Sequence, residues 1–140
     1  MTKIYFAGSI RAGRDDVPTY KSLIEHLQQY GEVLTEHVGD YSLSLHGQSH
    51  LSDTLVHDRD LQWLHSSNVV VAEVTSPSLG VCYEIAHAVA GNIPVLALYR
   101  GERDRISAMI AGSAGVDTVA YRELPEAYEA IDSALAAIRP

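Results

Sequence analysis

Two acidic residues, Asp60 and Glu84, occupy positions where a carboxylate could do chemistry. On a helix the neighbours of Asp60 are Val56, Trp63 and Leu64, three or four residues away, so it does not lie on a simple solvated face. Glu84 comes early in an alanine-rich segment with helical character. Two partly desolvated carboxylates near one pocket suit glycosidic chemistry, in which one attacks the anomeric carbon and the other handles protons.

Each acid also has a purely structural interpretation. Asp60 could lie at the rim of the core and pair with Arg59 or His57. Glu84 could belong to a capping box, but that motif requires Ser or Thr at position 81, which is Val81. Glu84 could also simply favour the positive end of its helix. The spacing leaves these alternatives open, and it does not give the separation of the carboxylates that distinguishes retention from inversion.

The loop after the first apolar run is a candidate phosphate site. Residues 1–14 hold three basic residues and no acid, in a chain that is acidic overall. The two glycines of the loop would let backbone N–H groups approach an anion, and Arg11 could donate two hydrogen bonds to a phosphate. The loop is not a P-loop, because the required Lys and Ser or Thr are absent. The alternative is a tight turn whose arginines pair with Asp15 and Asp16.

Seven histidines invite a metal interpretation that their spacing does not favour. No pair forms an H-E-x-x-H pattern, and Gly47 interrupts the pair His46 and His50. The single cysteine, Cys82, excludes both an internal disulfide and a cysteine-based zinc site. We expect Cys82 to be a small buried hydrophobe rather than a nucleophile. We therefore expect no metal and no cofactor.

Composition limits the class of protein. The chain has 140 residues, of which 46% are hydrophobic, and a net charge of −8. That length fits one domain spanning residues 1–140. The charge argues against nucleic acid or an anionic membrane as partner and leaves room for one small anion at a local basic spot. No apolar run approaches a membrane span and no signal-peptide pattern is evident, so we expect a cytoplasmic protein.

The elements that must position these residues alternate along the chain. We expect strands at residues 4–7, 33–34, 69–72, 94–99 and 118–121. We expect helices from Pro18 to a stop at Gly31, from Ser49 or Ser52 to His65, and at 81–90, 107–111 and 124–138. This order predicts an α/β fold, a doubly wound, Rossmann-like or flavodoxin-like five-stranded parallel sheet with helices on both faces. Ligands of such sheets bind at the carboxyl ends of the strands, here loops 8–16, 73–80 and 99–107, whereas polar residues 36–50 predict a mobile loop.

Six blocks of the sequence carry a family resemblance. They are YFAGSIR at 5–11, LTEHV at 34–38, DLQWL at 60–64, VVVAEVT at 69–75, PSLGVCYE at 77–84 and SAMI at 107–110. Together and in this order they resemble the 2′-deoxynucleoside 5′-phosphate N-hydrolases, which are relatives of the nucleoside 2-deoxyribosyltransferases. The resemblance covers nearly the whole chain.

The resemblance implies an enzyme that cleaves a deoxynucleoside monophosphate into free base and 2-deoxyribose 5-phosphate. Glu84 would be the nucleophile, Asp60 would orient it and handle protons, and Tyr5 would pack at the sugar and disfavour a 2′-hydroxyl. The implied nucleotide-binding residues are Gly8, Ser9, Ile10, Arg11, His37, Ser78, Gly80, Ser107 and Met109. Of these, Ser9, Arg11, Ser78 and Ser107 would hold the phosphate, while His37 and Met109 would line the sugar and base region. Ser107 and Met109 would reach the site of a neighbouring subunit, which implies a homodimer.

Three alternatives remain beside the hydrolase. A deoxyribosyltransferase would carry an acid near the sugar 5′-hydroxyl, where this chain has Ser78, a group that can donate to a phosphate. A nucleotide-binding module without catalysis would bind but release no base. A relative that cleaves ribonucleotides is disfavoured only by Tyr5. Cys82 stands where the resemblance leads us to expect Gly, so base preference stays open.

Overall fold

The computed structural model describes residues 1–9, 16–35 and 51–138. Three candidate binding residues, Ile10, Arg11 and His37, lie outside these ranges, as does the predicted mobile loop at 36–50.

Within the described residues, five strands form one parallel sheet. They are β1 (Thr2–Ala7), β2 (Gly31–Val33), β3 (Val69–Glu73), β4 (Val95–Tyr99) and β5 (Val116–Ala120), in the order β2-β1-β3-β4-β5. The order reverses between β1 and β3, which is the flavodoxin-like form of the doubly wound sheet. The predicted fold class is therefore confirmed, and the reversal puts the expected ligand crevice beside the end of β1.

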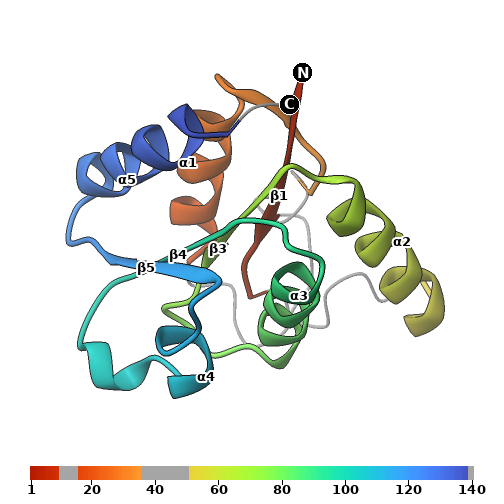
Figure 1. Cartoon of the computed structure of the whole chain (residues 1–140). Coiled ribbons are helices and arrows are strands. Elements are labelled where there is room, and N and C mark those ends of the chain that lie inside the picture. Colours follow the sequence, from red (N-terminus) through yellow and green to blue (C-terminus); the bar gives the residue numbers. More distant parts are fainter. Residues whose placement is uncertain (10–15, 36–50, 139–140) are drawn as a thin grey trace.

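Helices cover both faces of the sheet (Figure 1). One face carries α1 (Val17–Leu27) and α5 (Leu124–Ala136), and the other carries α2 (Asp53–Ser66), α3 (Leu79–Ala90) and the short α4 (Ala108–Ala111). Alternate side chains of the buried strands feed the two cores, so that Ile4 and Phe6 face α1 while Tyr5 and Ala7 face α3. β3 and β4 are buried along their whole length, and residues 69–72 of β3 and all of β4 are continuously apolar, as predicted.

Serine hydroxyls begin the helices that border the ligand edge. Ser52, Ser78 and Ser107 each accept a hydrogen bond from a backbone N–H in the first turn of α2, α3 and α4, respectively. Gly91 ends α3, and Asn92 follows it with a φ of 57°. A 3-10 turn, η2 (Arg103–Arg105), precedes α4. These ends agree closely with the predicted boundaries.

The prediction that Gly31 ends the first helix is wrong. Helix α1 stops at Leu27, and Gly31 is the first residue of β2, where it pairs with Thr2 of β1. A Cβ at position 31 would lie 2.0 Å from the Thr2 carbonyl oxygen, so the glycine permits the close approach of two strands.

The last strand also begins two residues earlier than predicted, at Val116 rather than Thr118. It is an edge strand in which Val116 alone is buried, so the apolar pattern that marks inner strands is absent there. Among the described residues, none of the helices combines the length and apolarity needed to cross a membrane.

Candidate active site

A pocket of about 900 Å³ opens at the carboxyl edge of the sheet. It is lined by α2, by the loop between β3 and α3, by the first turns of α3, and by residues 105–107 with Ile110. The predicted loops 73–80 and 99–107 therefore both contribute to it. Of the predicted loop 8–16, only the ends are described.

Glu84 lines this pocket from the second turn of α3. Its Oε2 accepts a hydrogen bond from the hydroxyl of Tyr5, which lies buried in β1. Burial raises the pKa of Glu84 to about 7, the Tyr5 hydrogen bond opposes that rise, and the charge of Asp60 adds to it. Burial and the two nearby carboxylates also raise the pKa of Tyr5, so its hydroxyl remains a donor. The result is a fixed carboxyl group that changes charge near neutral pH.

Asp60 lines the same pocket from α2. Its side chain is 20% exposed, and Oδ1 accepts hydrogen bonds from Arg59 Nη2 at 2.8 Å and Nε at 3.0 Å. The guanidinium of Arg59 in turn lies 4.6 Å from the centre of the Trp63 ring. The pairing with Arg59 that the sequence left open thus occurs, and it occurs in the pocket wall beside Glu84.

The apolar side chains of α2 serve the pocket more than the core. Leu64 is the one residue of α2 that is buried, whereas Val56 and Leu61 line the pocket and Leu55 is 62% exposed. The predicted apolar surface of this helix exists, but much of it faces the pocket and not the core.

Ser78 and Gly80 border the pocket at the N-terminus of α3. Ser78 Oγ accepts from the Val81 N–H at 3.2 Å, which leaves its hydroxyl proton available to a ligand. A Cβ on Gly80 would meet no atom nearer than Ser78 Oγ at 3.8 Å, so this glycine leaves space open instead of relieving a clash. Backbone N–H groups and the positive end of a helix make this corner suited to an anion.

Ser107 and Met109 lie at the start of α4. Ser107 lines the pocket and accepts from the Met109 N–H at 3.2 Å. Met109 is 83% exposed and is not among the residues lining the pocket of this chain.

Gly8 and Ser9 follow β1 and pack against α1. A Cβ on Gly8 would lie 3.0 Å from the Tyr20 ring, and the Ser9 N–H donates to the Tyr20 hydroxyl at 3.1 Å. Ser9 is fully buried. The sequence predicted that Gly8 allows close approach of an anion, and the structure adds that it makes room for an aromatic ring.

The prediction that Cys82 is a small buried hydrophobe is wrong. Cys82 is exposed and lines the pocket. Helix α3 turns Val81, Ile85 and Ala88 toward the sheet, and the position after Val81 is rotated away from that face.

Sequence reasoning missed a buried carboxylate, Glu73, and the groups around it. Glu73 ends β3, and Arg100 and Asp16 lie beside it from the ends of two other elements. The only signal in the sequence was an acid directly after four apolar strand residues. No group of three or more His, Cys, Asp or Glu side chains is arranged to hold a metal ion in the part of the chain that the structure describes.

The chain is similar to known proteins of one family. The nucleoside 2-deoxyribosyltransferase family model matches residues 4–121. The chain is 55% identical over 111 residues to a 5-hydroxymethyl-dUMP N-hydrolase of Danio rerio, a match that covers 79% of this chain and 78% of that protein. It is 50% identical over 113 residues to the Mus musculus protein of the same name, covering 79% and 65%.

Solved structures share the fold at low sequence identity. A 2-deoxyribosyltransferase from Bacillus psychrosaccharolyticus matches with a TM-score of 0.68 at 16% identity, covering 99% of this chain and 98% of the other. A CMP N-glycosidase of Clostridium botulinum matches with a TM-score of 0.67 at 16% identity, covering 95% and 99%. The matched range and the identity to the Danio rerio protein together confirm the resemblance found in the sequence, and this chain belongs to the nucleoside 2-deoxyribosyltransferase family.

Proposed function

We propose that this protein hydrolyses the N-glycosidic bond of 2′-deoxynucleoside 5′-monophosphates, with free base and 2-deoxyribose 5-phosphate as products. The observation that carries the proposal is a partly buried carboxyl, Glu84, held by the Tyr5 hydroxyl in a pocket that it shares with Asp60. The names of relatives at about half identity, 5-hydroxymethyl-dUMP N-hydrolases, support the same bond and substrate class.

In the first step the ionised Glu84 attacks C1′ of the deoxyribose. A bond forms between a Glu84 oxygen and C1′, the C1′–N bond breaks, and its electron pair leaves with the base, which takes up a solvent proton relayed by Asp60. The Tyr5 hydrogen bond orients the attacking carboxylate. A pKa of about 7 leaves a substantial fraction of Glu84 ionised at neutral pH and keeps it reactive.

In the second step water hydrolyses the glycosyl-enzyme. Asp60, again ionised, takes a proton from the water, whose oxygen bonds to C1′ while the bond to Glu84 breaks, and then releases that proton to solvent. Both carboxyl groups thereby return to their starting forms. The contact with Arg59 holds Asp60 in place through this cycle.

The N-terminus of α3 is proposed to bind the 5′-phosphate through Ser78 and the backbone beside Gly80, together with Ser107 contributed by a second copy of the chain. Gly8, Ser9, Ile10 and Arg11 are proposed to complete this site, and His37 to line the sugar and base region, on the basis of the resemblance. A hydroxyl donates to a phosphate where a carboxylate would repel it, so Ser78 favours nucleotides over nucleosides.

A second copy of the chain is proposed to complete each site. Large apolar side chains are exposed around the pocket, among them Leu79 at 93%, Met109 at 83%, Leu55 at 62% and Tyr83 at 49%. Such a patch beside a pocket is typical of a protein–protein contact. Together with the family membership it supports a homodimer in which Ser107 and Met109 reach the partner's pocket.

The catalytic proposal is tested by base-release assays across deoxy- and ribonucleoside monophosphates, with the matching nucleosides as controls. We expect release from the deoxynucleotides and little from the other two groups. Adding a second free base separates the alternatives: base exchange without net hydrolysis indicates a transferase, and binding without release indicates a module without catalysis.

The dimer proposal is tested by mixing two inactive proteins, Glu84→Gln and the double variant Ser107→Ala/Met109→Ala. A mixed dimer would have one pocket with both an intact Glu84 and an intact partner rim. About a quarter of the wild-type activity should return, since half of the randomly assorted dimers are mixed. No recovery, with subunit exchange verified by a mass tag, would exclude a shared site.

We also propose that one domain of this family spans residues 1–140. Helix α5 follows the matched range, yet it packs in the same core as α1 and β1. A cytoplasmic location is also proposed, and cell fractionation can check it.

A further inference from the structure

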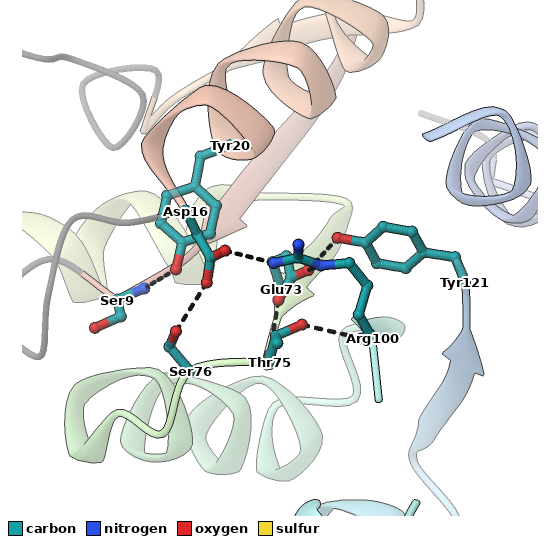
Figure 2. A network of polar contacts seen from close by, with 8 residues as sticks. All are labelled: Ser9, Asp16, Tyr20, Glu73, Thr75, Ser76, Arg100 and Tyr121. Atoms are coloured by element: carbon teal, nitrogen blue, oxygen red, sulfur yellow. Dashed lines mark hydrogen bonds and ion pairs between the residues drawn. The ribbon is translucent and has the colours of Figure 1, made fainter. Parts of the chain in front are cut away.

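Glu73, at the end of β3, is a completely buried charged side chain. Its Oε1 accepts a hydrogen bond from the Thr75 N–H at 2.7 Å, and its Oε2 accepts one from the Tyr121 hydroxyl (Figure 2). Burial raises the pKa of Glu73, and these hydrogen bonds and the charge of Arg100 oppose the rise. The carboxyl is therefore held from two sides, and it fixes the backbone where β3 ends and the pocket loop begins, which is the segment 74–78 between β3 and α3.

Arg100, directly after β4, lies between two carboxyl groups. Its Nη2 donates to Asp16 Oδ1, and its Nε lies 3.9 Å from Glu73 Oε2. That Nε is buried and has no hydrogen-bond partner among the described residues. The backbone N–H of Arg100 donates a hydrogen bond to Thr75 Oγ1 at 3.0 Å, so Arg100 also contacts the pocket loop directly.

Asp16 extends this network to the start of α1. It occupies the N-cap position, where an aspartate would ordinarily bond the first turn, but its side chain makes no capping hydrogen bond. Instead its Oδ2 accepts from Ser76 Oγ at 2.8 Å while Oδ1 faces Arg100. Ser76 itself lines the pocket. The network thus joins α1, the pocket loop and β4 at the ligand edge.

We propose that Arg100 is a positioning residue for the substrate phosphate, an inference that rests on the proposed function. Arg100 is not among the residues that line the pocket, so it acts through others. It holds the loop that carries Ser76 and Ser78, and it neutralises Asp16, whose unpaired carboxylate would repel a phosphate bound at that loop. Its loss should therefore weaken binding of phosphorylated substrates and leave the glycosidic step nearly intact.

The test compares Arg100→Met, Asp16→Asn and the double variant, with kcat and KM measured on a deoxynucleoside monophosphate and on its nucleoside. Arg122→Met is the matched control, because Arg122 is 92% exposed and pairs only weakly, at 3.8 Å, with Glu126 of α5. For Arg100→Met we expect about a tenfold rise in KM for the nucleotide, the effect of one uncompensated charge roughly 10 Å away at intermediate dielectric. We expect little change in kcat, little change with the nucleoside, and no change in Arg122→Met.

The double variant separates charge from packing. Removing the Asp16 charge should restore most of the nucleotide affinity lost in Arg100→Met, which simple loss of packing would not allow. Thermal unfolding of each variant verifies that it is folded. Equal losses on nucleotide and nucleoside, a loss confined to kcat, or no recovery in the double variant would overturn the proposal.

The role of Arg100 can be tested even if the proposed hydrolase function fails. If the wild-type protein releases no base, calorimetry with 2-deoxyribose 5-phosphate replaces the kinetic assay. A tenfold weaker affinity in Arg100→Met, recovered in the double variant, would then support the positioning role, whereas unchanged affinity would reject it.

Discussion

Glu84 and Glu73 make an instructive pair. Both are glutamates near the ligand edge, both accept a hydrogen bond from a tyrosine hydroxyl, and burial raises the pKa of both. Glu73 has in addition a backbone N–H and a nearby guanidinium, and it is completely buried. Glu84 instead has the charge of Asp60 close by and forms part of a pocket wall.

The difference shows how the hydrogen-bond partners and the exposure of a glutamate suit it to different roles. A carboxylate whose oxygens are satisfied by the protein is stabilised where it is and can hold loops together. A carboxylate with fewer compensating groups, open to a pocket, retains free energy that bond formation with a substrate can release. Each of the following variants tests one part of this contrast.

The largest effect should come from Glu84→Gln. Base release should fall by at least about a thousandfold, because an amide cannot act as the proposed nucleophile. The same substitution at Glu73 should retain turnover within about tenfold, since Glu73 does not line the pocket. Initial rates with a deoxynucleoside monophosphate check both values, and equal losses at the two positions would abolish the contrast.

The Glu84→Gln protein should also be more stable than the wild type at pH 8. The folded-state pKa of about 7 lies above the ordinary 4.5, so ionisation of Glu84 lowers the free energy of unfolding as pH rises from 4.5 to 7. The gain at pH 8 should be on the order of 1 to 3 kcal/mol and should vanish near pH 4. Chemical denaturation at the two pH values measures it, and an equal gain at both would contradict the assigned cause.

A second effect should appear in the pH profile. If ionised Glu84 is the nucleophile, kcat/KM should rise with pH through about 7. Asp60→Asn should lower the maximum rate by about a hundredfold through loss of proton transfer. It should also move the rise toward lower pH, since the charge of Asp60 raises the pKa of Glu84. If kcat/KM of Asp60→Asn rises at the same pH as in the wild type, the two carboxyl groups do not interact.

Smaller effects are expected from removing the hydroxyls of Tyr5 and Tyr121, and the two effects should differ in kind. Tyr5→Phe removes a hydrogen bond that lowers the pKa of Glu84, so at pH 7 the rate should fall about tenfold and the pH profile should move upward. Tyr121→Phe leaves a buried oxygen of Glu73 without its donor, which should lower the free energy of unfolding by about 1 to 3 kcal/mol. Its kcat should change little. Rates and free energies of unfolding measured on both variants decide whether the Tyr5 hydroxyl contributes to catalysis and the Tyr121 hydroxyl to stability.

The smallest effect should come from Cys82→Ser, a change of one atom in the pocket wall near Glu84. Turnover should stay within about threefold of wild type. Because Cys82 is exposed in the pocket, a bulky thiol reagent should inactivate the wild-type protein and leave Cys82→Ser active. Inactivation of both proteins would show that the reagent acts elsewhere.

The sequence predicted what depends on local spacing. Continuous apolar runs located the inner strands, and helix neighbours singled out Asp60 and Glu84, because these signals extend over only a few residues. The exposure of Cys82 and the start of β2 depend on how a helix or strand is set against its neighbours, which local spacing does not encode. The Glu73 network was out of reach for the same reason, since its partners lie 48, 60 and 84 residues apart in the chain.

The contact between Tyr5 and Glu84 joins residues that are 79 positions apart. Contacts of such long range in a parallel sheet form late in folding, after the entropy of closing a long loop has been overcome. Until β1 has docked beside β3, Glu84 lacks the Tyr5 hydrogen bond and remains an ordinary solvated carboxylate. Recovery of base release during refolding should therefore follow the slowest step of sheet assembly, so that catalysis itself reports when the fold is finished.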